Sequence, residues 1–391
     1  MNRKVNILYY LSALYIGLIP LEAITVTEGM SYGRLVFYAL AAISLLDLKN
    51  SFQVTADMKH IKILFVFMAY AAFTTLWSID MARTFDQLAK LVQYMMITLV
   101  ATNHAQNWKR LRGYMLAYCL GCLYIGYLSL TNYDPQAYLR DDEAGNPNEN
   151  AFMINYAIVF LFIILNKDSM KNWMKCIFYG CIMLFSFFIF ILGSRNGFIM
   201  LIITFITFLY SSVFRRFNFR NVIISIALIV GLYYMFQTLP ETLIDRFLGI
   251  SNSIDDNDFG GRGDIWDLTL AYLPNAGLKL IFGCGWGTFV QFFGQMTGRY
   301  QGAHNFFLTV LTTVGIIGFI IVLYYLKTLY NYLKKMISGK DKSLFIYYLL
   351  IILPLVSMMT TNWESRKWWF VISIFIFLLY KNERKGMLQC R

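Results

Sequence analysis

Residues 255–318 read DDNDFGGRGDIWDLTLAYLPNAGLKLIFGCGWGTFVQFFGQMTGRYQGAHNFFLTVLTTVGIIG. The stretch begins as a polar loop and ends in a strongly apolar run that starts at Phe306. Within the loop, Arg262 stands between glycines, residues 282–287 form the turn-rich run FGCGWG, and His304 stands just before the apolar run. Apolar runs of about 17–25 residues are typical of transmembrane helices. The stretch therefore predicts a long polar loop that leads directly into a membrane-spanning helix.

The rest of the chain is also far more apolar than a soluble protein. Of its 391 residues, 58% are hydrophobic and 14% are charged, whereas soluble domains carry about 25% charged residues. Inside a bilayer every backbone amide needs a partner within the protein, which favours helices. We therefore expect an all-α polytopic membrane protein, built as a single integral membrane domain over residues 1–391.

The apolar runs and the polar joints between them predict about twelve transmembrane helices. These cover residues 7–21, 32–48, 61–77, 85–102, 113–130, 151–165, 173–192, 197–214, 222–239, 306–326, 344–360 and 366–380. Residues 240–305 form a large loop before the tenth helix. A long loop without low-complexity sequence is usually functional. We expect a short helix near residues 263–271, with Asp264 suited to its first turn.

The distribution of basic residues sets the predicted orientation. Most of the 34 lysines and arginines fall at the termini and in the loops on one side, while most acidic residues fall on the other side. Cytoplasmic loops of membrane proteins carry the excess of lysine and arginine. Both termini are therefore predicted to be cytoplasmic, and the loop 240–305 extracytoplasmic. This pattern explains the net charge of +12, so no nucleic-acid partner is expected.

The first apolar run has a second interpretation, as a signal peptide, because it follows the basic start MNRK. No clear A-x-A cleavage site follows the run, however, and a signal peptide normally ends in one. Removing the run would also disturb the alternation of basic and acidic loops. We therefore interpret residues 7–21 as an uncleaved first span.

Two arginines in the extracytoplasmic loops are candidates for binding an anion. Arg195 lies in a very short joint between two apolar spans, where a permanent cation is costly unless it is paired or faces water. Arg262 is flanked by glycines, which let backbone amides approach an anion. A guanidinium binds phosphate through two parallel hydrogen bonds and keeps its charge. Two alternatives stay open, in which Arg195 extends to lipid headgroups and Arg262 pairs with Asp258 or Asp264.

His304 is the candidate proton acceptor of the same loop. Imidazole titrates near neutral pH and suits the removal of a proton from a hydroxyl group. The alternative is a structural histidine that bonds the backbone at a helix start. A single histidine among arginines makes a poor zinc site, because zinc needs three or four ligands. Residues 256–258 match the D-x-D pattern of metal and sugar-diphosphate sites, but a solvated acidic turn is the favoured interpretation.

Three further cations have weaker sequence contexts. Arg299 and Lys279 lie in the same loop without distinctive neighbours. Lys90 falls inside a predicted span, where a lysine needs a partner. Asp86, one helical turn away, is the favoured partner, and the alternative is that Lys90 helps to hold an anion near the outer leaflet.

Considered together, the motifs are similar to those of the O-antigen ligase/polymerase superfamily. The similar segments, in chain order, are LWSID at 76–80, NPN at 146–148, GSRNG at 193–197, GRxxIW at 261–266, FGxGxG at 282–287, AHN at 303–305 followed by Leu308, GIIG at 315–318 and NWES at 362–365. Each motif alone is weak. Their order, spacing and common extracytoplasmic location make the set specific.

The resemblance implies a C-type glycosyltransferase of the bacterial cytoplasmic (inner) membrane, active in surface polysaccharide biosynthesis. Such an enzyme moves a glycan from an undecaprenyl diphosphate carrier to an acceptor hydroxyl on the periplasmic face, and it uses no metal or other cofactor. By motif, the implied catalytic residues are His304, Arg262 and Arg195. Arg195 and Arg262 would bind the diphosphate and stabilise its charge as it leaves, and His304 would act as the base. Arg299, Asn148 and Glu364 complete the expected substrate-binding set.

The acceptor stays open at this point. A ligase passes finished chains to lipid A-core, whereas a polymerase joins a second lipid-linked repeat unit. The presence of both His304 and Arg262 favours the ligase type slightly. A lipid-linked oligosaccharide flippase or transporter is the alternative from another class, but transporters usually show internal repeats and none is visible here. Expected partners are membrane lipid and other polysaccharide assembly proteins.

Overall fold

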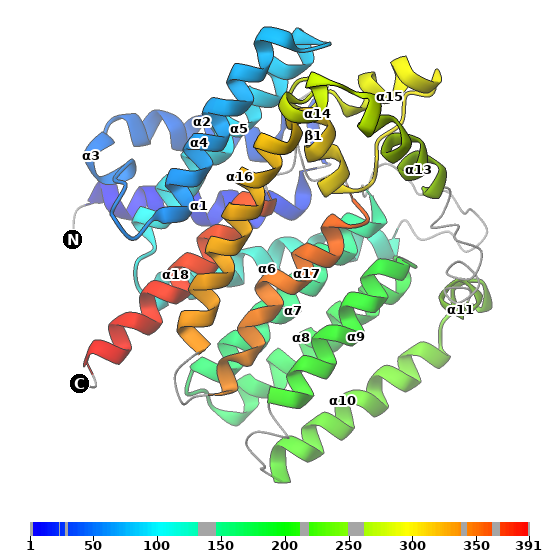
Figure 1. Ribbon diagram of the computed structural model, residues 1–391. Helices are drawn as coiled ribbons and strands as arrows, with labels where there is room; N and C mark the ends of the chain where they lie inside the picture. Colours follow the sequence, from blue (N-terminus) through cyan, green and yellow to red (C-terminus); the bar gives the residue numbers. More distant parts are fainter. Residues whose placement is uncertain are drawn as a thin grey trace.

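The computed structural model describes residues 3–22, 24–27, 30–131, 146–211, 219–248, 262–337, 342–361 and 368–389, and this part is almost entirely helical (Figure 1). The elements of the first half are α1 (Arg3–Leu18), η1 (Ile19–Leu21), β1 (Thr25–Thr27), β2 (Met30–Ser31), α2 (Tyr32–Leu45), α3 (Leu48–Ser51), α4 (Lys59–Phe73), η2 (Thr74–Trp77), α5 (Met81–His104), α6 (Trp108–Thr131), α7 (Pro147–Lys167) and α8 (Asn172–Ile191). The remaining elements are α9 (Arg195–Leu209), α10 (Phe219–Gln237), α11 (Glu241–Leu248), α13 (Gly263–Tyr272), η4 (Leu273–Asn275), α14 (Leu278–Phe282), α15 (Phe289–Thr297), α16 (Phe306–Ile337), η5 (Lys342–Tyr348), α17 (Leu349–Met358) and α18 (Trp368–Gln389). The two short strands pair as an antiparallel hairpin between α1 and α2.

The helical membrane fold is confirmed, while the number of twelve spans stays a prediction. Five helices are long and apolar enough to cross a membrane, namely Lys59–Trp77, Trp108–Thr131, Pro147–Lys167, Asn172–Ile191 and Phe306–Ile337. Four of them contain a predicted span, and Asn172–Ile191 covers the predicted span 173–192 except for its last residue. Five of the other predicted spans coincide with shorter apolar helices in the described part of the chain. An α-helix rises about 1.5 Å per residue, so a short helix such as α2 does not by itself match the thickness of a bilayer core.

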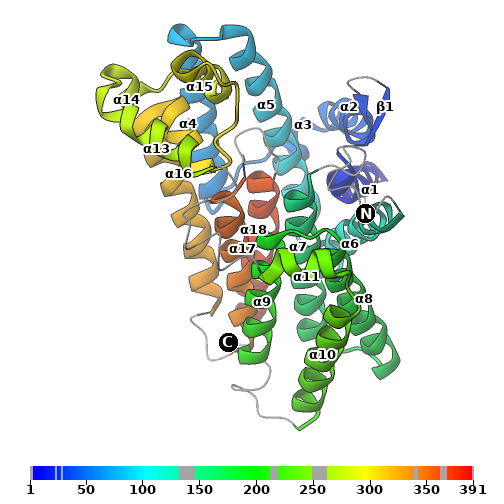
Figure 2. The same ribbon diagram turned by 90° about the vertical axis from the view of Figure 1, so that its right-hand side faces the viewer.

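Helix α7 lies at the centre of the helical bundle. Within its best 18-residue window, 83% of the residues are buried inside the protein, and it packs against α6, α8, α9 and α17 (Figures 1 and 2). Its sequence explains this position, because residues 151–164 are apolar almost all round the helix and such a helix is buried. The surrounding helices expose large apolar side chains outward, as expected of surfaces that face lipid.

Helix α16 is broken near its start, which differs from the continuous tenth span expected from hydropathy. Gly315 adopts φ 64° and ψ −171°, and the helical path is interrupted there. A break leaves backbone carbonyls without helical partners. Here the carbonyl oxygens of Thr312 and Thr313 accept hydrogen bonds from the amides of Cys284 and Gly285, at 3.1 and 2.9 Å. The loop before α16 therefore supplies the hydrogen-bond donors that the broken helix lacks.

The loop segment itself has a small apolar core, separate from the large core of the bundle. Its buried members come from α13, η4, α15, the start of α16 and the connections on either side of α15, and are Ile265, Leu273, Cys284, Phe289, Phe292, Phe293, Ala303 and Leu308. The short helix expected near residues 263–271 is confirmed as α13, with Asp264 in its first turn. The described part of the loop thus forms a compact unit on the bundle, seen at the upper right of Figure 1.

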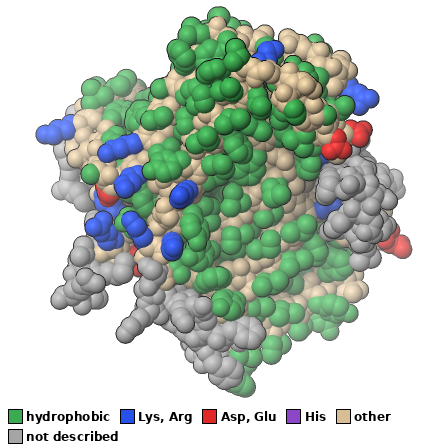
Figure 3. Space-filling view, in the orientation of Figure 1, with side chains coloured by type: hydrophobic (Ala, Val, Ile, Leu, Met, Phe, Trp, Pro, Cys, Tyr) green, Lys and Arg blue, Asp and Glu red, His purple; other side chains and the backbone are tan. Residues whose placement is uncertain are grey.

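Charged side chains are separated across the molecule. Figure 3 shows apolar side chains over the middle of one face, most of the visible lysines and arginines on the left, and the visible acidic residues mainly on the right. Both ends of the chain also lie on the left side of Figure 1. An apolar surface bounded by charged edges is typical of a protein that lies within a membrane.

Candidate active site

Three distant segments meet at the end of α17. The backbone oxygen of Thr360 accepts a hydrogen bond from Nη1 of Arg262 at 3.0 Å. The hydroxyl oxygen of the same threonine accepts one from Nδ2 of Asn196 at 2.6 Å. Thr360 lies two residues past Met358, where the helix has ended, so its carbonyl has no helical partner and is available to a guanidinium. We call this meeting point of residues 196, 262 and 360 the Thr360 junction.

Arg195 is the first residue of α9, directly beside the junction. Gly193 takes φ 57°, which lets the chain turn sharply out of α8, and Ser194 caps α9 by accepting a hydrogen bond from the amide of Gly197 at 3.0 Å. The Arg195 side chain is half-buried. Because Asn196 is bonded to Thr360, the predicted anion ligands Arg195 and Arg262 belong to one local structure although 66 residues of chain separate them.

Asn148, in the first turn of α7, contacts the residue that precedes Arg195. Its Oδ1 accepts a hydrogen bond of 2.7 Å from the hydroxyl of Ser194, the residue that caps α9. Asn146 caps α7 in turn, by accepting from the amide of Asn148 at 3.0 Å. The starts of α7 and α9 are therefore joined by side chains, and Asn148 contributes to holding Arg195 in place.

One turn further along α7 and α9, the two helices approach each other closely. The buried residue Asn155 lies at this approach, and sequence analysis did not single it out. A side chain at Gly197 would meet the Cβ of Ala151 at 2.4 Å. Asn155 is fully buried and donates to the backbone oxygens of Ala151 at 2.9 Å and Gly197 at 3.0 Å. The sequence signal for Asn155 was a polar amide side chain inside an otherwise apolar span. Buried polar groups in membrane helices are costly and tend to be functional or structural.

The electrostatics of the junction favour an anion. Helices α7, α9 and α13 all begin here, and the start of a helix carries unpaired amides and a partial positive charge of about +0.5. The end of α17 contributes the opposite sign, but the Arg262 guanidinium bonds the Thr360 carbonyl just past that end. Helix starts combined with two arginines resemble known phosphate sites in their chemistry.

His304 is tied to the same structure through α13. Arg262 immediately precedes this helix, and its carbonyl accepts from the amide of Trp266 at 3.1 Å. The indole Nε1 of Trp266 then donates to the backbone oxygen of Ala303 at 2.8 Å. A single helical turn therefore connects the backbone of Arg262 to the residue that precedes His304.

The backbone at His304 is unusual. It has φ 49°, and it is the sole non-glycine residue with positive φ among those that the structure describes. Positive φ is uncommon for non-glycine residues, among which asparagine, aspartate and histidine adopt it most often, and it often occurs at functional sites. The next residue, Asn305, starts α16 by accepting from the amide of Leu308 at 3.1 Å. His304 is thus held between a helix start and the Trp266 bond, with its side chain half-buried.

The glycine-rich run at 282–287 is a structural element rather than a binding loop. Trp286 is fully buried and packs edge-on against Phe67, with ring centroids 5.1 Å apart. A Cβ at Gly283 would meet the backbone oxygen of Thr313 at 2.2 Å. The run also accepts hydrogen bonds from the segment 76–80, at 3.2 Å from Trp77 Nε1 to the Gly283 oxygen and at 3.0 Å from the Ile79 amide to the Cys284 oxygen.

Cys284 does not offer a nucleophile in this arrangement. Burial raises the pKa of its thiol to about 11, and only the thiolate attacks. The hydrogen bonds between segments 76–80 and 282–287 show that these two motifs contact each other. Their glycines and tryptophans allow close packing between the loop and the bundle.

The remaining candidates are less connected to the junction. Arg299 and Lys279 are exposed, and no contact that the structure describes joins either to Thr360. Lys90 pairs with Asp86 at 2.9 Å, as expected from their spacing. Glu364, Asp256 and Asp258 lie outside the described residues.

Comparison with known proteins adds one finding. No curated protein matches the chain. Residues 180–323, which include Arg195, Arg262, Arg299 and His304, match the family model described as O-antigen ligase. Asn148 and Thr360 lie outside the matched segment, although they contact residues within it. Over residues 180–323, the match confirms the resemblance to the O-antigen ligase/polymerase superfamily that was drawn from the motifs.

Proposed function

We propose that this protein is an O-antigen ligase-type membrane glycosyltransferase. It takes a glycan from an undecaprenyl diphosphate carrier and passes it to a sugar hydroxyl on the periplasmic face of the bacterial cytoplasmic membrane, in surface polysaccharide synthesis. The observation that carries the proposal is the Thr360 junction, where Arg262 and the start of α9 come together at the beginnings of three helices. The match to the O-antigen ligase family supports the reaction class.

The donor explains why cations lie beside apolar helices. A lipid diphosphate is an anion on a long apolar tail, so its site needs positive charge at the edge of a lipid-facing surface. Arg195 and Arg262 supply that charge, and guanidinium groups bind phosphate oxygens in pairs of hydrogen bonds. Charge develops on the diphosphate as it departs, and preorganised donors stabilise charge of this kind in the transition state.

The reaction then proceeds as a displacement at the anomeric carbon. The acceptor hydroxyl oxygen forms the new bond to that carbon, the bond from the carbon to the phosphate oxygen breaks, and the diphosphate leaves with the electron pair. The proton of the acceptor hydroxyl passes to the imidazole of His304, which acts as general base. The diphosphate is a good leaving group, so no strong general acid is required.

The other predicted residues have supporting roles in the proposal. Asn148 orients the start of α9 through Ser194. Arg299 contributes a further cation at the exposed end of α15, next to the Gly298 turn that ends this helix. Glu364 is assigned to orientation of the acceptor.

Purified protein in lipid vesicles, supplied with synthetic undecaprenyl diphosphate-linked repeat units and an acceptor glycan, tests the proposal. New glycosidic bonds that depend on both substrates are expected. Movement of the lipid-linked glycan between leaflets without any new bond would make the protein a transporter instead.

The lipids that accumulate in a deletion strain distinguish the two reactions of the superfamily. A ligase is expected to leave long-chain glycan on the carrier lipid, because the chain is finished but not transferred. Accumulation of carrier with a single repeat unit would show that the protein is a repeat-unit polymerase.

A further inference from the structure

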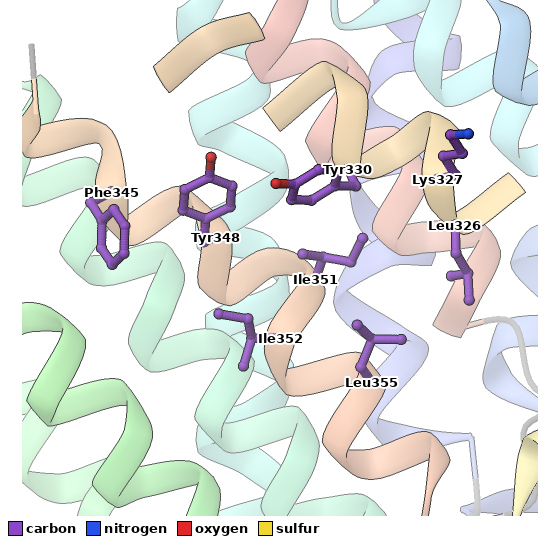
Figure 4. Close-up of a pocket in the computed structure, with 8 residues that line it drawn as sticks. All are labelled: Leu326, Lys327, Tyr330, Phe345, Tyr348, Ile351, Ile352 and Leu355. Carbon is purple, nitrogen blue, oxygen red and sulfur yellow. The ribbon is translucent and has the colours of Figure 1, made fainter. Parts of the chain in front are cut away.

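A surface hollow lies on the outside of the bundle, along the part of α17 that precedes the Thr360 junction. It has a volume of about 620 Å³ and lies between the second half of α16 and the segment formed by η5 and α17 (Figure 4). Its lining residues are Leu326, Lys327, Tyr330, Phe345, Tyr348, Ile351, Ile352 and Leu355. We call this hollow the α16–α17 groove.

The groove has a polar edge and an apolar floor. Figure 4 shows the hydroxyl groups of Tyr330 and Tyr348 close to each other and the ammonium group of Lys327 apart from them, beside Leu326, with Ile352 and Leu355 below. The two tyrosine rings are stacked, with centroids 6.0 Å apart and planes at 22°. Tyrosines whose rings contact apolar groups and whose hydroxyl groups reach water are typical of the interface between membrane and water.

The direction of α17 shows where the groove lies relative to the candidate active site. The helix runs from its N-cap Tyr348, in the groove, to Met358, two residues before Thr360 at the candidate active site. The two tyrosines therefore lie at the end of the groove that is farther from the Thr360 junction, and the predicted orientation makes this the cytoplasmic end. Lys334 and Lys335 follow on α16, as expected of a cytoplasmic helix end.

Lys327 is the charged feature of the groove. Its side chain is exposed, and no ion pair involves it among the residues described here. A cation on a lipid-facing flank is favourable when it reaches the headgroup region. The cytoplasmic leaflet contains anionic lipids, and a basic residue near it gains about 1 kcal/mol.

We propose that the α16–α17 groove binds an anionic glycerophospholipid of the cytoplasmic leaflet. The phosphate contacts Lys327, the rest of the headgroup lies beside the hydroxyls of Tyr330 and Tyr348, and one acyl chain runs along Ile352 and Leu355 toward the middle of the membrane. The order of polar edge and apolar floor matches the order of headgroup and chain in a lipid of that leaflet. A sugar is a poor occupant, because the floor has no hydrogen-bonding groups apart from the backbone.

Photoactivatable phosphatidylglycerol and phosphatidylcholine, each incorporated into vesicles with the full-length protein, test this site. Mass spectrometry then locates the lipid adducts on the chain. Phosphatidylglycerol is expected to label residues of the groove, and Lys327→Gln should lower that labelling about fivefold. Lys334→Gln, which removes an exposed charge from the same helix outside the groove, should leave it unchanged.

A second pair of variants tests the floor independently of the charge. Ile352→Trp fills the groove and should remove most of the labelling, while Ile320→Trp, on the exposed surface of α16 outside the groove, should not. Equal labelling by phosphatidylcholine and phosphatidylglycerol would overturn the proposal. So would protection of the groove by a second copy of the chain, seen as cross-linking between protomers, or labelling confined to a photoactivatable polyprenyl phosphate.

Discussion

At the scale of single residues, Arg262 is the side chain that joins the loop to the bundle. One hydrogen bond fixes its guanidinium to the Thr360 carbonyl, and the proposed diphosphate would occupy the neighbouring positive region. Such a role needs the planar fork of arginine as well as its charge.

Arg262→Lys is therefore expected to reduce transfer by about 10- to 100-fold, because hydrogen bonds to charged groups contribute about 1.5–3 kcal/mol. Initial rates with a lipid-linked donor measure the effect. Lys279→Gln, a change at an exposed cation of the same loop, serves as the control and should retain activity. Full activity of Arg262→Lys would exclude a bidentate contact with phosphate.

His304 gives a second prediction at this scale. A general base contributes about 10²–10⁴-fold, so His304→Ala should slow transfer to that extent while donor binding stays near the wild-type value. Imidazole acts as a base only when unprotonated, so wild-type activity should fall toward acidic pH, and this dependence should flatten in the variant. An identical pH profile in both proteins would exclude the base role.

At the scale of elements, helix α13 connects the proposed anion ligand Arg262 to the proposed base His304. It begins at the Arg262 side of the loop, and Trp266 on its first turns holds the backbone beside His304. The helix thus positions the anion ligand and the base relative to each other. Trp266 acts through His304 and needs no contact with substrate.

Trp266→Phe keeps the ring but removes the hydrogen bond to Ala303, which is worth about 0.5–1.5 kcal/mol. We expect a fall in kcat with little change in the KM for the donor, together with an altered pH profile because His304 is repositioned. Trp77→Phe is the matched control, since it removes a similar indole bond, to Gly283, away from His304. A loss of thermal stability of the same size in both variants with no change in pH profile would assign Trp266 a structural role alone.

The break in α16 gives a prediction about stability. Gly315 has a backbone conformation that is accessible almost only to glycine, and a Cβ there would meet the backbone oxygen of Ile281 at 2.3 Å. Gly315→Ala should destabilise the protein by more than the roughly 1–3 kcal/mol of backbone strain. Thermal unfolding in detergent measures this. Gly180→Ala, at a helical glycine with nothing within 4 Å of the added atom, should leave the unfolding temperature unchanged or raise it.

At the scale of the whole molecule, the two ends of the bundle have different tasks. One end carries the Thr360 junction and the folded loop with its own core. The other carries the α16–α17 groove and the basic helix ends. This division agrees with the charge separation seen in Figure 3.

Labelling of single cysteines tests the orientation behind this division. In a variant without its 6 native cysteines, Arg299→Cys should react with a membrane-impermeant maleimide in intact spheroplasts. Lys334→Cys should react only after the membrane is opened, because the basic loops are predicted to be cytoplasmic. The reverse pattern would place the candidate active site on the cytoplasmic side and contradict a periplasmic reaction.

Several local features were predictable from the sequence because each depends on neighbouring residues. The Lys90–Asp86 pair follows from a spacing of one helical turn. Helix α13 follows from its glycine and acidic start, and α7 from its uniform apolarity. The break at Gly315 was not predictable in this way, since hydropathy is unchanged across it and the partners of its carbonyls lie in another segment.

The sequence by itself determined the class of the molecule, because apolar runs must enter lipid as helices and the basic loops between them indicate a side. It also named Arg195, Arg262 and His304 as residues of interest through their motifs. Only the tertiary structure decided that residues 196 and 262 meet at Thr360, and that Trp266 bonds the backbone beside His304. Contacts of this kind join positions far apart in the chain, and they depend on how the helices pack, which local residue pattern does not encode.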